Sequence, residues 1–278
     1  MNTFRLSAFA DEAAVAFADQ LAALKKHGID LLEFRGYDGK NVSKLTDQEA
    51  RTAKCMLDDA GISLSALGSP YGKYPIEADF AIHRAEFRRG LELAHMLGTD
   101  KIRMFSFFMP AEGDAAAWRG KVIDQLGEML DMAKAEDVLL CHENEKGIYG
   151  DTDERCLDLL QTFPQLGCVF DPANFIQCGV DSLTAFDRMA SRMTYVHVKD
   201  ALRDSGAVVP AGYGDADFAA LITRLRMLER PLILTLEPHL TVFKGLSDLQ
   251  GEALLHKYSY PDDMAAFSAA VDAVKALL

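Results

Sequence analysis

Eight short apolar runs recur along the chain, and segments with helical periodicity lie between them. The runs read FRLSAF, IDLLEF, ISLSAL, KIRMFSF, VLLCHE, LGCVFD, MTYVHV and PLILTLE. Short apolar runs of this kind are typical of strands buried in a parallel sheet. Alternation of strand and helix implies parallel strands joined by right-handed crossovers, and eight such units close into a barrel. We therefore predict an α/β fold, a (β/α)8 TIM barrel, as a single domain over residues 1–278.

The predicted helices have recognisable ends. Amphipathic segments cover 12–27, 47–60, 79–97 and 115–136, where apolar residues recur at spacings of three and four. Gly28, Gly61 and Gly98 each stand just before an apolar run, which is where glycine ends a helix. The acidic DTD tripeptide at 151–153 predicts the N-terminal cap of the next helix.

The charge of the chain restricts its partners. The 278 residues carry a formal net charge of −13, with a sequence pI near 5.0. Such a surface repels phosphate backbones and anionic membranes, so we expect neither nucleic acid nor a membrane as partner. A small phosphorylated sugar stays open, because a local cation can create a positive pocket.

The cysteines and the N-terminal sequence indicate the cellular compartment in which the protein is expected. Five cysteines without a CxxC pair predict neither a disulfide framework nor a zinc ribbon. No secretory leader or membrane-spanning run is evident, so we expect a cytoplasmic protein. The sequence does not determine the oligomeric state, and a homo-oligomer is possible.

Residues of metal-binding types stand at the C-terminal ends of four different runs. They are Glu143, Asp171, His197 and Glu237. The carboxyl ends of barrel strands meet at one face, so these side chains are expected to converge. Three carboxylates and one imidazole suit a hard or borderline divalent cation, Mn²⁺ first, with Mg²⁺, Co²⁺ or Zn²⁺ as alternatives. His197 also alternates with Tyr195 and Lys199 on one face of its strand.

Further polar residues near the strand ends are candidate substrate contacts. Glu33 ends the second run, with Arg35 following, and either could bind a hydroxyl or phosphate or pair with the other. Glu145 lies in the loop after the fifth run, and His239 lies two residues beyond Glu237. Nucleotide-binding, P-loop and serine-hydrolase motifs are absent from the sequence.

The segments ENEKGIYGD, FDPANF, YVHVKD, VVPAGYGD and LEPH, in this order, resemble the xylose isomerase-like TIM-barrel superfamily. The resemblance covers nearly the whole chain and is greatest to sugar and sugar-phosphate isomerases and epimerases. That group includes ketose 3-epimerases, inosose dehydratases and, more distantly, endonuclease IV. The resemblance implies a divalent metal held by the four residues named above and a small carbohydrate substrate.

In the ketose 3-epimerases of this superfamily, two metal-binding glutamates remove and return a proton next to a carbonyl. By resemblance, these catalytic residues are Glu143 and Glu237. Asn174 stands where those epimerases have a substrate-binding histidine, and Arg203 is a loose match to their arginine beyond the metal-binding histidine. Asn174 could donate to a sugar hydroxyl. Lys199 could assist an oxyanion, or pair with Asp200 or Glu237.

The sequence therefore predicts a metal-dependent isomerase or epimerase that acts through an enediolate. An alternative is a metal-dependent lyase of the inosose dehydratase type, because the same enediolate can expel a β-hydroxyl group. An endonuclease IV-like hydrolase would need three clustered metals and more histidines than the seven in this chain. The net charge of −13 also disfavours it. A sugar-binding barrel without catalysis is the remaining alternative. The sequence does not identify the sugar, its phosphorylation or the native metal.

Overall fold

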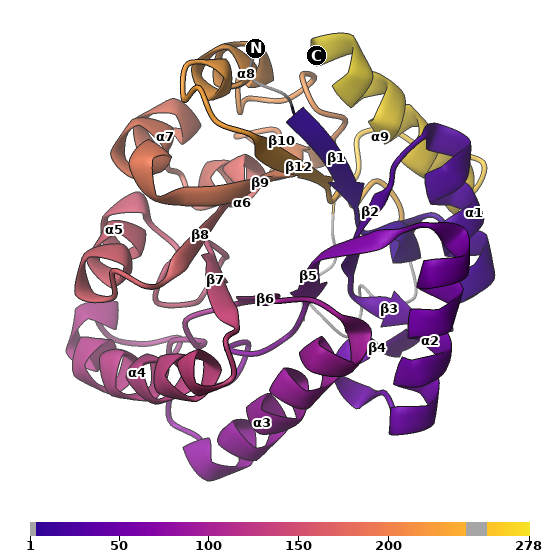
Figure 1. Cartoon of the computed structure of the whole chain (residues 1–278). Helices are drawn as coiled ribbons and strands as arrows, with labels where there is room; N and C mark the ends of the chain where they lie inside the picture. Colours follow the sequence, from indigo (N-terminus) through magenta and orange to yellow (C-terminus); the bar gives the residue numbers. More distant parts are fainter. Residues whose placement is uncertain (1–3, 243–254) are drawn as a thin grey trace.

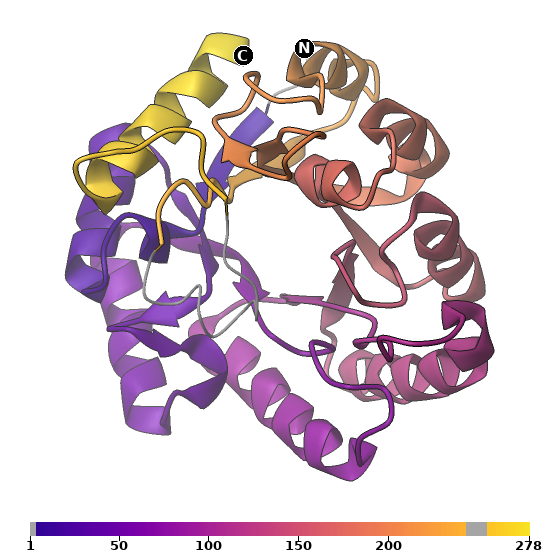
Figure 2. The ribbon, with the colours of Figure 1, turned by 180° about the vertical axis from the view of Figure 1, so that it is seen from behind.

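Eight parallel strands form a closed barrel, in the order β1-β12-β9-β8-β7-β6-β5-β2. The computed structural model describes residues 4–242 and 255–278. Helices surround the barrel in views along both directions of its axis (Figures 1 and 2). The barrel strands are β1 (Phe4–Ala8), β2 (Leu31–Phe34), β5 (Ser63–Gly68), β6 (Lys101–Met104), β7 (Leu139–Glu143), β8 (Gly167–Phe170), β9 (Met193–Val198) and β12 (Leu232–Leu236). Each coincides with one of the eight predicted runs, except that β5 extends one residue further, to Gly68, and this confirms the TIM-barrel prediction.

The outer layer consists of helices that follow the barrel strands in the chain, the last of them after β12. They are α1 (Phe17–His27), α2 (Asp47–Ala60), α3 (Phe80–Leu97), α4 (Arg119–Ala135), α5 (Asp153–Thr162), α6 (Pro172–Gln177), α7 (Ser182–Met189), α8 (Phe218–Arg226) and α9 (Asp263–Leu277). Short 3-10 turns precede α1 and α4, η1 (Ala10–Glu12) and η3 (Ala115–Trp118), so the first predicted helix is really two segments. The others are η2 (Val42–Lys44) and η4 (Ala190–Arg192).

The helix ends follow the local sequence signals. Gly28, Gly61 and Gly98 cap their helices in the left-handed region, at φ of 68°, 68° and 78°. These positions suit glycine because a Cβ atom is disfavoured there. The Thr152 side chain accepts a hydrogen bond from the backbone N–H of Arg155 and so caps α5, as the DTD tripeptide predicts.

The barrel is closed by its first and last strands. β1 pairs with β12 in register from Phe4–Leu232 to Ala8–Leu236. A small apolar cluster of Ala66, Cys141, Val169 and Tyr195, drawn from four strands, lies apart from the main core. The main core packs between the sheet and the helices, so the polar side chains at the carboxyl ends of the strands rest on a rigid, well-packed support.

Two small hairpins extend the loops after β2 and β9: β3 (Gly36–Tyr37) with β4 (Lys40–Asn41), and β10 (Asp200–Ala201) with β11 (Val208–Val209). The loop after β9 folds over one buried carboxylate. Asp200 accepts hydrogen bonds at 2.9–3.1 Å from the backbone N–H groups of Ala201, Gly212, Gly214 and Ala216. Two amides of the GYGD segment, those of Gly212 and Gly214, thus bind an internal carboxylate. The sequence also predicts a long loop over 238–261, after the last apolar run, and residues 243–254 of it lie outside the described residues.

Within the described ranges, the helices are all too short or too polar to cross a lipid bilayer.

One buried histidine in the helical layer predicts a stability effect at acidic pH. His83 on α3 is 2% exposed, and its Nε2 accepts a hydrogen bond from the backbone N–H of Gly72 at 3.1 Å. Burial lowers the pKa of His83 to about 4. Between pH 6.5 and 4, the unfolded chain therefore carries a proton that the folded protein lacks. This histidine destabilises the fold as pH falls through that window.

We expect His83→Gln, whose amide oxygen can still accept from Gly72, to remove this contribution. Urea unfolding at a series of pH values should show a slope shallower than that of the wild type, by about 1.4 kcal/mol per pH unit. Equal slopes for the two proteins between pH 4 and 6.5 would contradict the assignment.

Candidate metal and active site

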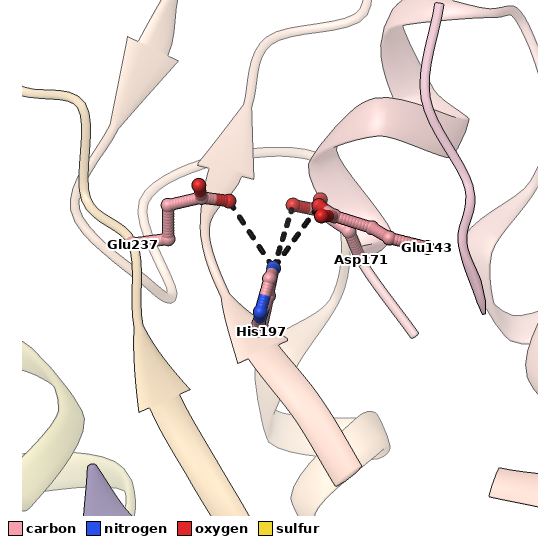
Figure 3. Close-up of side chains that lie close together, drawn as sticks. All are labelled: Glu143, Asp171, His197 and Glu237. Carbon is pink, nitrogen blue, oxygen red and sulfur yellow. Dashed lines mark hydrogen bonds and ion pairs between the residues drawn. The ribbon is translucent and has the colours of Figure 1, made fainter. Parts of the chain in front are cut away.

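The structure brings the four predicted ligands together at the carboxyl ends of four strands. Glu143 is the last residue of β7, Asp171 follows β8, His197 lies in β9, and Glu237 follows β12. One ligand atom from each lies within 4.8 Å of the others, and all four residues are buried. Figure 3 shows Glu237 on one side of the His197 ring, with Glu143 and Asp171 on the other.

His197 is at the centre of this group. Its Nδ1 atom lies 3.0 Å from Glu143 Oε1, 3.2 Å from Glu237 Oε2 and 3.9 Å from Asp171 Oδ2. Its side chain is fully buried. The nitrogen that faces the three carboxylates is therefore Nδ1.

Asp171 is oriented by helix capping. Its Oδ1 accepts a hydrogen bond from the backbone N–H of Asn174 at 2.9 Å, which makes Asp171 the N-cap of α6. Its Oδ2 then points toward the cluster. The Asn144 side chain fixes the backbone of Asp171, donating to its carbonyl and accepting from its N–H at 2.8 and 2.9 Å.

Buried cations flank the two glutamates. Arg35 Nη1 lies 3.0 Å from Glu237 Oε1, and Arg103 Nε lies 3.2 Å from Glu143 Oε2. The two guanidinium groups approach one aromatic ring, that of Phe9, at 4.2 and 5.3 Å from its centroid. The two guanidinium groups thus compensate part of the negative charge of the carboxylate cluster.

The electrostatic balance differs among the cluster members. Burial raises the pKa of Asp171 to about 7, although the nearby Lys199 opposes that change. For Glu237, burial is outweighed by Lys199, His239 and His197, which hold its pKa well below the usual range. Burial disfavours protonation of His197, but Glu143, Glu33 and Glu237 raise its pKa well above the usual value. These carboxylates favour positive charge at the centre of the cluster.

The donor set fits a divalent cation. Asp171 Oδ2 and Glu143 Oε2 are buried without an aligned hydrogen-bond donor, although Lys199 Nζ and Arg103 Nε lie close to them. Three carboxylates and one imidazole match the oxygen and nitrogen ligands of Mn²⁺, Mg²⁺ or Zn²⁺. Such a cation would supply partners for these oxygens.

The structure places most of the other candidate residues close to the cluster. Lys199 Nζ lies 2.8 Å from Asp171 Oδ2 and 3.2 Å from Glu237 Oε2. Asn174 Nδ2 donates to Glu143 Oε1 at 3.3 Å. The Glu145 carboxylate pairs with Lys73 at 2.8 Å and is almost fully buried.

Three candidates differ from expectation. Arg203 is exposed, and its backbone N–H donates to Asp215, so the structure does not bring this residue to the cluster. Glu33 is buried behind His197, at 3.1 Å from Nε2, on the side away from the other carboxylates. His239 is buried with Nε2 3.5 Å from Glu237 Oε1, rather than lying at an open rim.

A second group of potential ligands adjoins the first but is occupied by an arginine. Glu12, Glu237 and His239 lie close enough to share an ion. The Arg35 guanidinium lies among them, at 2.9 Å from Glu12 Oε1 and 3.4 Å from His239 Nε2. Glu12 also accepts from the backbone N–H of His239 at 2.6 Å. This group therefore braces Glu237.

Sequence reasoning missed Arg103 and Glu12 as parts of this architecture, and it named Asp200 only as a possible partner of Lys199, whereas Lys199 pairs with Asp171 and Glu237. Arg103 carried a signal, since a charged residue within an apolar strand run requires a buried partner. Glu12 carried none, because it lies in a short 3-10 turn.

Comparison with known families agrees with this geometry. The family model described as xylose isomerase-like TIM barrel matches residues 21–251. The chain belongs to this family. The match includes the strands that carry all four members of the cluster. No curated protein sequence matches the chain significantly.

Solved xylose isomerase-like barrels resemble the chain in fold at low sequence identity. An L-ribulose 3-epimerase has a TM-score of 0.76 and 20% identity, covering 100% of this chain and 95% of its own. The IOLI protein with a bound zinc atom has a TM-score of 0.76 and 16% identity, with coverages of 98% and 97%. A probable 3-DHS dehydratase, AsbF from Bacillus anthracis, has a TM-score of 0.69 and 17% identity, with coverages of 84% and 92%. At these identities, the likeness concerns the fold alone.

Proposed function

We propose that this protein is a divalent-metal-dependent isomerase or epimerase of a sugar, sugar phosphate or related polyhydroxy carbonyl compound. The observation that carries the proposal is the convergence of Glu143, Asp171, His197 and Glu237 at the mouth of the barrel. Epimerases among the structurally similar barrels, and the zinc atom of the IOLI protein, support it. We favour Mn²⁺ as the native ion and the cytoplasm as the location.

The proposed chemistry is proton transfer at a carbon next to a carbonyl. The bound cation would polarise the carbonyl and stabilise negative charge on its oxygen. Glu143 and Glu237 would act as the two acid/base groups, since they approach the cluster from opposite sides (Figure 3). One glutamate removes the proton and the other returns it to the opposite face.

The residues around the glutamates would hold the substrate and set their orientation. Arg35 and Arg103 keep the two carboxylates in place. Asn174 Nδ2 also donates to the carbonyl oxygen of Asn144 at 2.8 Å, which fixes its amide at the edge of the cluster, where it can meet a hydroxyl group. Lys199 places an ammonium group where it could donate to a developing oxyanion.

A lyase reaction is the second candidate, and Lys199 is the observation that favours it. A β-elimination needs a base at the carbon and an acid that protonates the departing hydroxyl group. Lys199 Nζ, beside Asp171 and Glu237, could be that acid. Release of water with formation of an absorbing enone would distinguish elimination from epimerisation.

Metal removal tests the proposed function. The purified protein is expected to contain a divalent metal, and with Mn²⁺ restored it should incorporate solvent deuterium next to the carbonyl of at least one ketose, ketose phosphate or inosose. Exhaustive chelation should abolish the exchange, because the carbonyl would no longer be polarised. Mass spectrometry of the recovered substrates measures the incorporation. Undiminished exchange by verified metal-free protein would refute metal dependence.

A further inference from the structure

The imidazole of His197 separates one buried carboxylate from three others. Behind the ring, Glu33 Oε2 lies 3.1 Å from Nε2, and both side chains are fully buried. In front of the ring, Nδ1 faces the metal-binding cluster. The two residues come from β2 and β9, which are not neighbours in the barrel, so their contact spans its interior.

Glu33 is itself held by two other strands. The Tyr195 hydroxyl donates to Glu33 Oε1 at 2.8 Å, and Arg103 Nε lies 3.6 Å from the same oxygen. The edge of Phe9 packs against the His197 ring, with centroids 5.3 Å apart and planes at 81°. The carboxylate and the ring are therefore fixed relative to each other by packing as well as by hydrogen bonding.

This arrangement selects one tautomer of the histidine. A neutral imidazole carries a hydrogen on only one nitrogen, and the other nitrogen has a free lone pair. Glu33 can only accept a hydrogen bond when ionised, so the hydrogen belongs on Nε2 and the lone pair on Nδ1. Without Glu33, the hydrogen could occupy Nδ1, which would block coordination.

We infer that Glu33 is a positioning residue that holds His197 as the Nε2–H tautomer and so prepares Nδ1 to bind the metal. The inference rests on the proposed function, in which the cluster holds a cation. Glu33 is fully buried behind the His197 ring, so this role replaces the substrate contact predicted from its position at the end of a strand. A carboxylate that accepts from a metal-binding histidine also strengthens the histidine as a ligand.

Metal affinity tests the inference without reference to turnover. Zn²⁺ is titrated into metal-free protein against a competing chelator, and Glu33→Gln should weaken binding by about 10- to 100-fold. Glu145→Gln is the matched control, because it removes a buried carboxylate near the cluster that does not contact His197. The control should weaken binding clearly less. Equal effects of the two substitutions would show a general charge effect and overturn the inference.

The tautomer gives a second, independent measurement. Nitrogen NMR of isotopically labelled histidine in the zinc-loaded wild type should show hydrogen on Nε2 and metal on Nδ1 of His197. Glu33→Asp, which keeps the charge but withdraws it from Nε2, should weaken zinc binding to an intermediate degree and serves as the test if Glu33→Gln does not fold. Wild-type affinity in Glu33→Asp, or hydrogen on Nδ1 in the wild type, would also overturn the inference. Failure of the wild type to bind any divalent metal would instead refute the proposed function.

Discussion

Glu143→Gln and Glu237→Gln are each expected to lower kcat for epimerisation by about a thousandfold or more. Both side chains lie in the buried cluster, on opposite sides of His197 Nδ1. The amide preserves size and an oxygen ligand but cannot accept or return a proton. General acid–base catalysis alone contributes about 10²- to 10⁴-fold, and a reaction at carbon without its base has no efficient alternative route.

The control separates proton transfer from metal binding. Asp171→Asn removes a charge from the same cluster at a residue with no assigned proton-transfer role. Its activity should recover at saturating Mn²⁺, whereas the activity of the two glutamine variants should stay low at full metal occupancy. Steady-state assays with parallel metal analysis measure both quantities. Full activity in either glutamine variant would disprove the two-base mechanism.

Lys199→Met is expected to change metal affinity and turnover in opposite directions. The ammonium lies within 2.8–3.2 Å of oxygens of Asp171 and Glu237, so it repels a cation bound by the same oxygens. Its removal should strengthen binding of Mn²⁺ by about tenfold, a modest part of the Coulomb energy at this separation. Turnover should fall by about 100-fold, because a preorganised donor to the oxyanion is lost.

This opposite response distinguishes a catalytic lysine from a structural one. A lysine that merely stabilises the fold would lower metal affinity, turnover and thermal stability together. Lys199→Arg keeps the charge and serves as the matched control, with metal affinity close to that of the wild type. Calorimetric titration of Mn²⁺ and initial-rate assays measure the two effects. Weaker metal binding in Lys199→Met would contradict this account.

The fold and the centre of the site follow from local sequence because both depend on strand periodicity. Each apolar run becomes one barrel strand, and residues after parallel strands must meet at one face. The convergence of Glu143, Asp171, His197 and Glu237 can therefore be predicted from the strand positions alone. The alternation of Tyr195, His197 and Lys199 likewise predicts that these side chains share one face, and the structure shows all three buried on it with polar partners.

Contacts across the barrel could not be predicted in this way. The pairing of Glu33 with His197 and the approach of Arg103 to Glu33 depend on the stagger between strands that are not neighbours, which apolar runs do not encode. Arg203 is a different case, because the structure does not bring this residue to the cluster. A position matched by resemblance in a loop has no periodicity to fix its direction, and the hairpin turns this side chain to the surface.

The loop after β9 has a shape that is specified by main-chain groups. Four backbone N–H groups converge on Asp200, so the side chains between Ala201 and Ala216 contribute little to this bonding. Gly212 and Gly214 are exceptions, because Gly212 has a φ of 87° and a Cβ atom at Gly214 would lie 2.2 Å from Asp200 Oδ1. Substitutions at the exposed positions of the loop can therefore accumulate, in nature or in a directed library, without loss of the anchor. The barrel thus offers a segment near its mouth in which substrate preference can diversify while the cluster beneath remains unchanged.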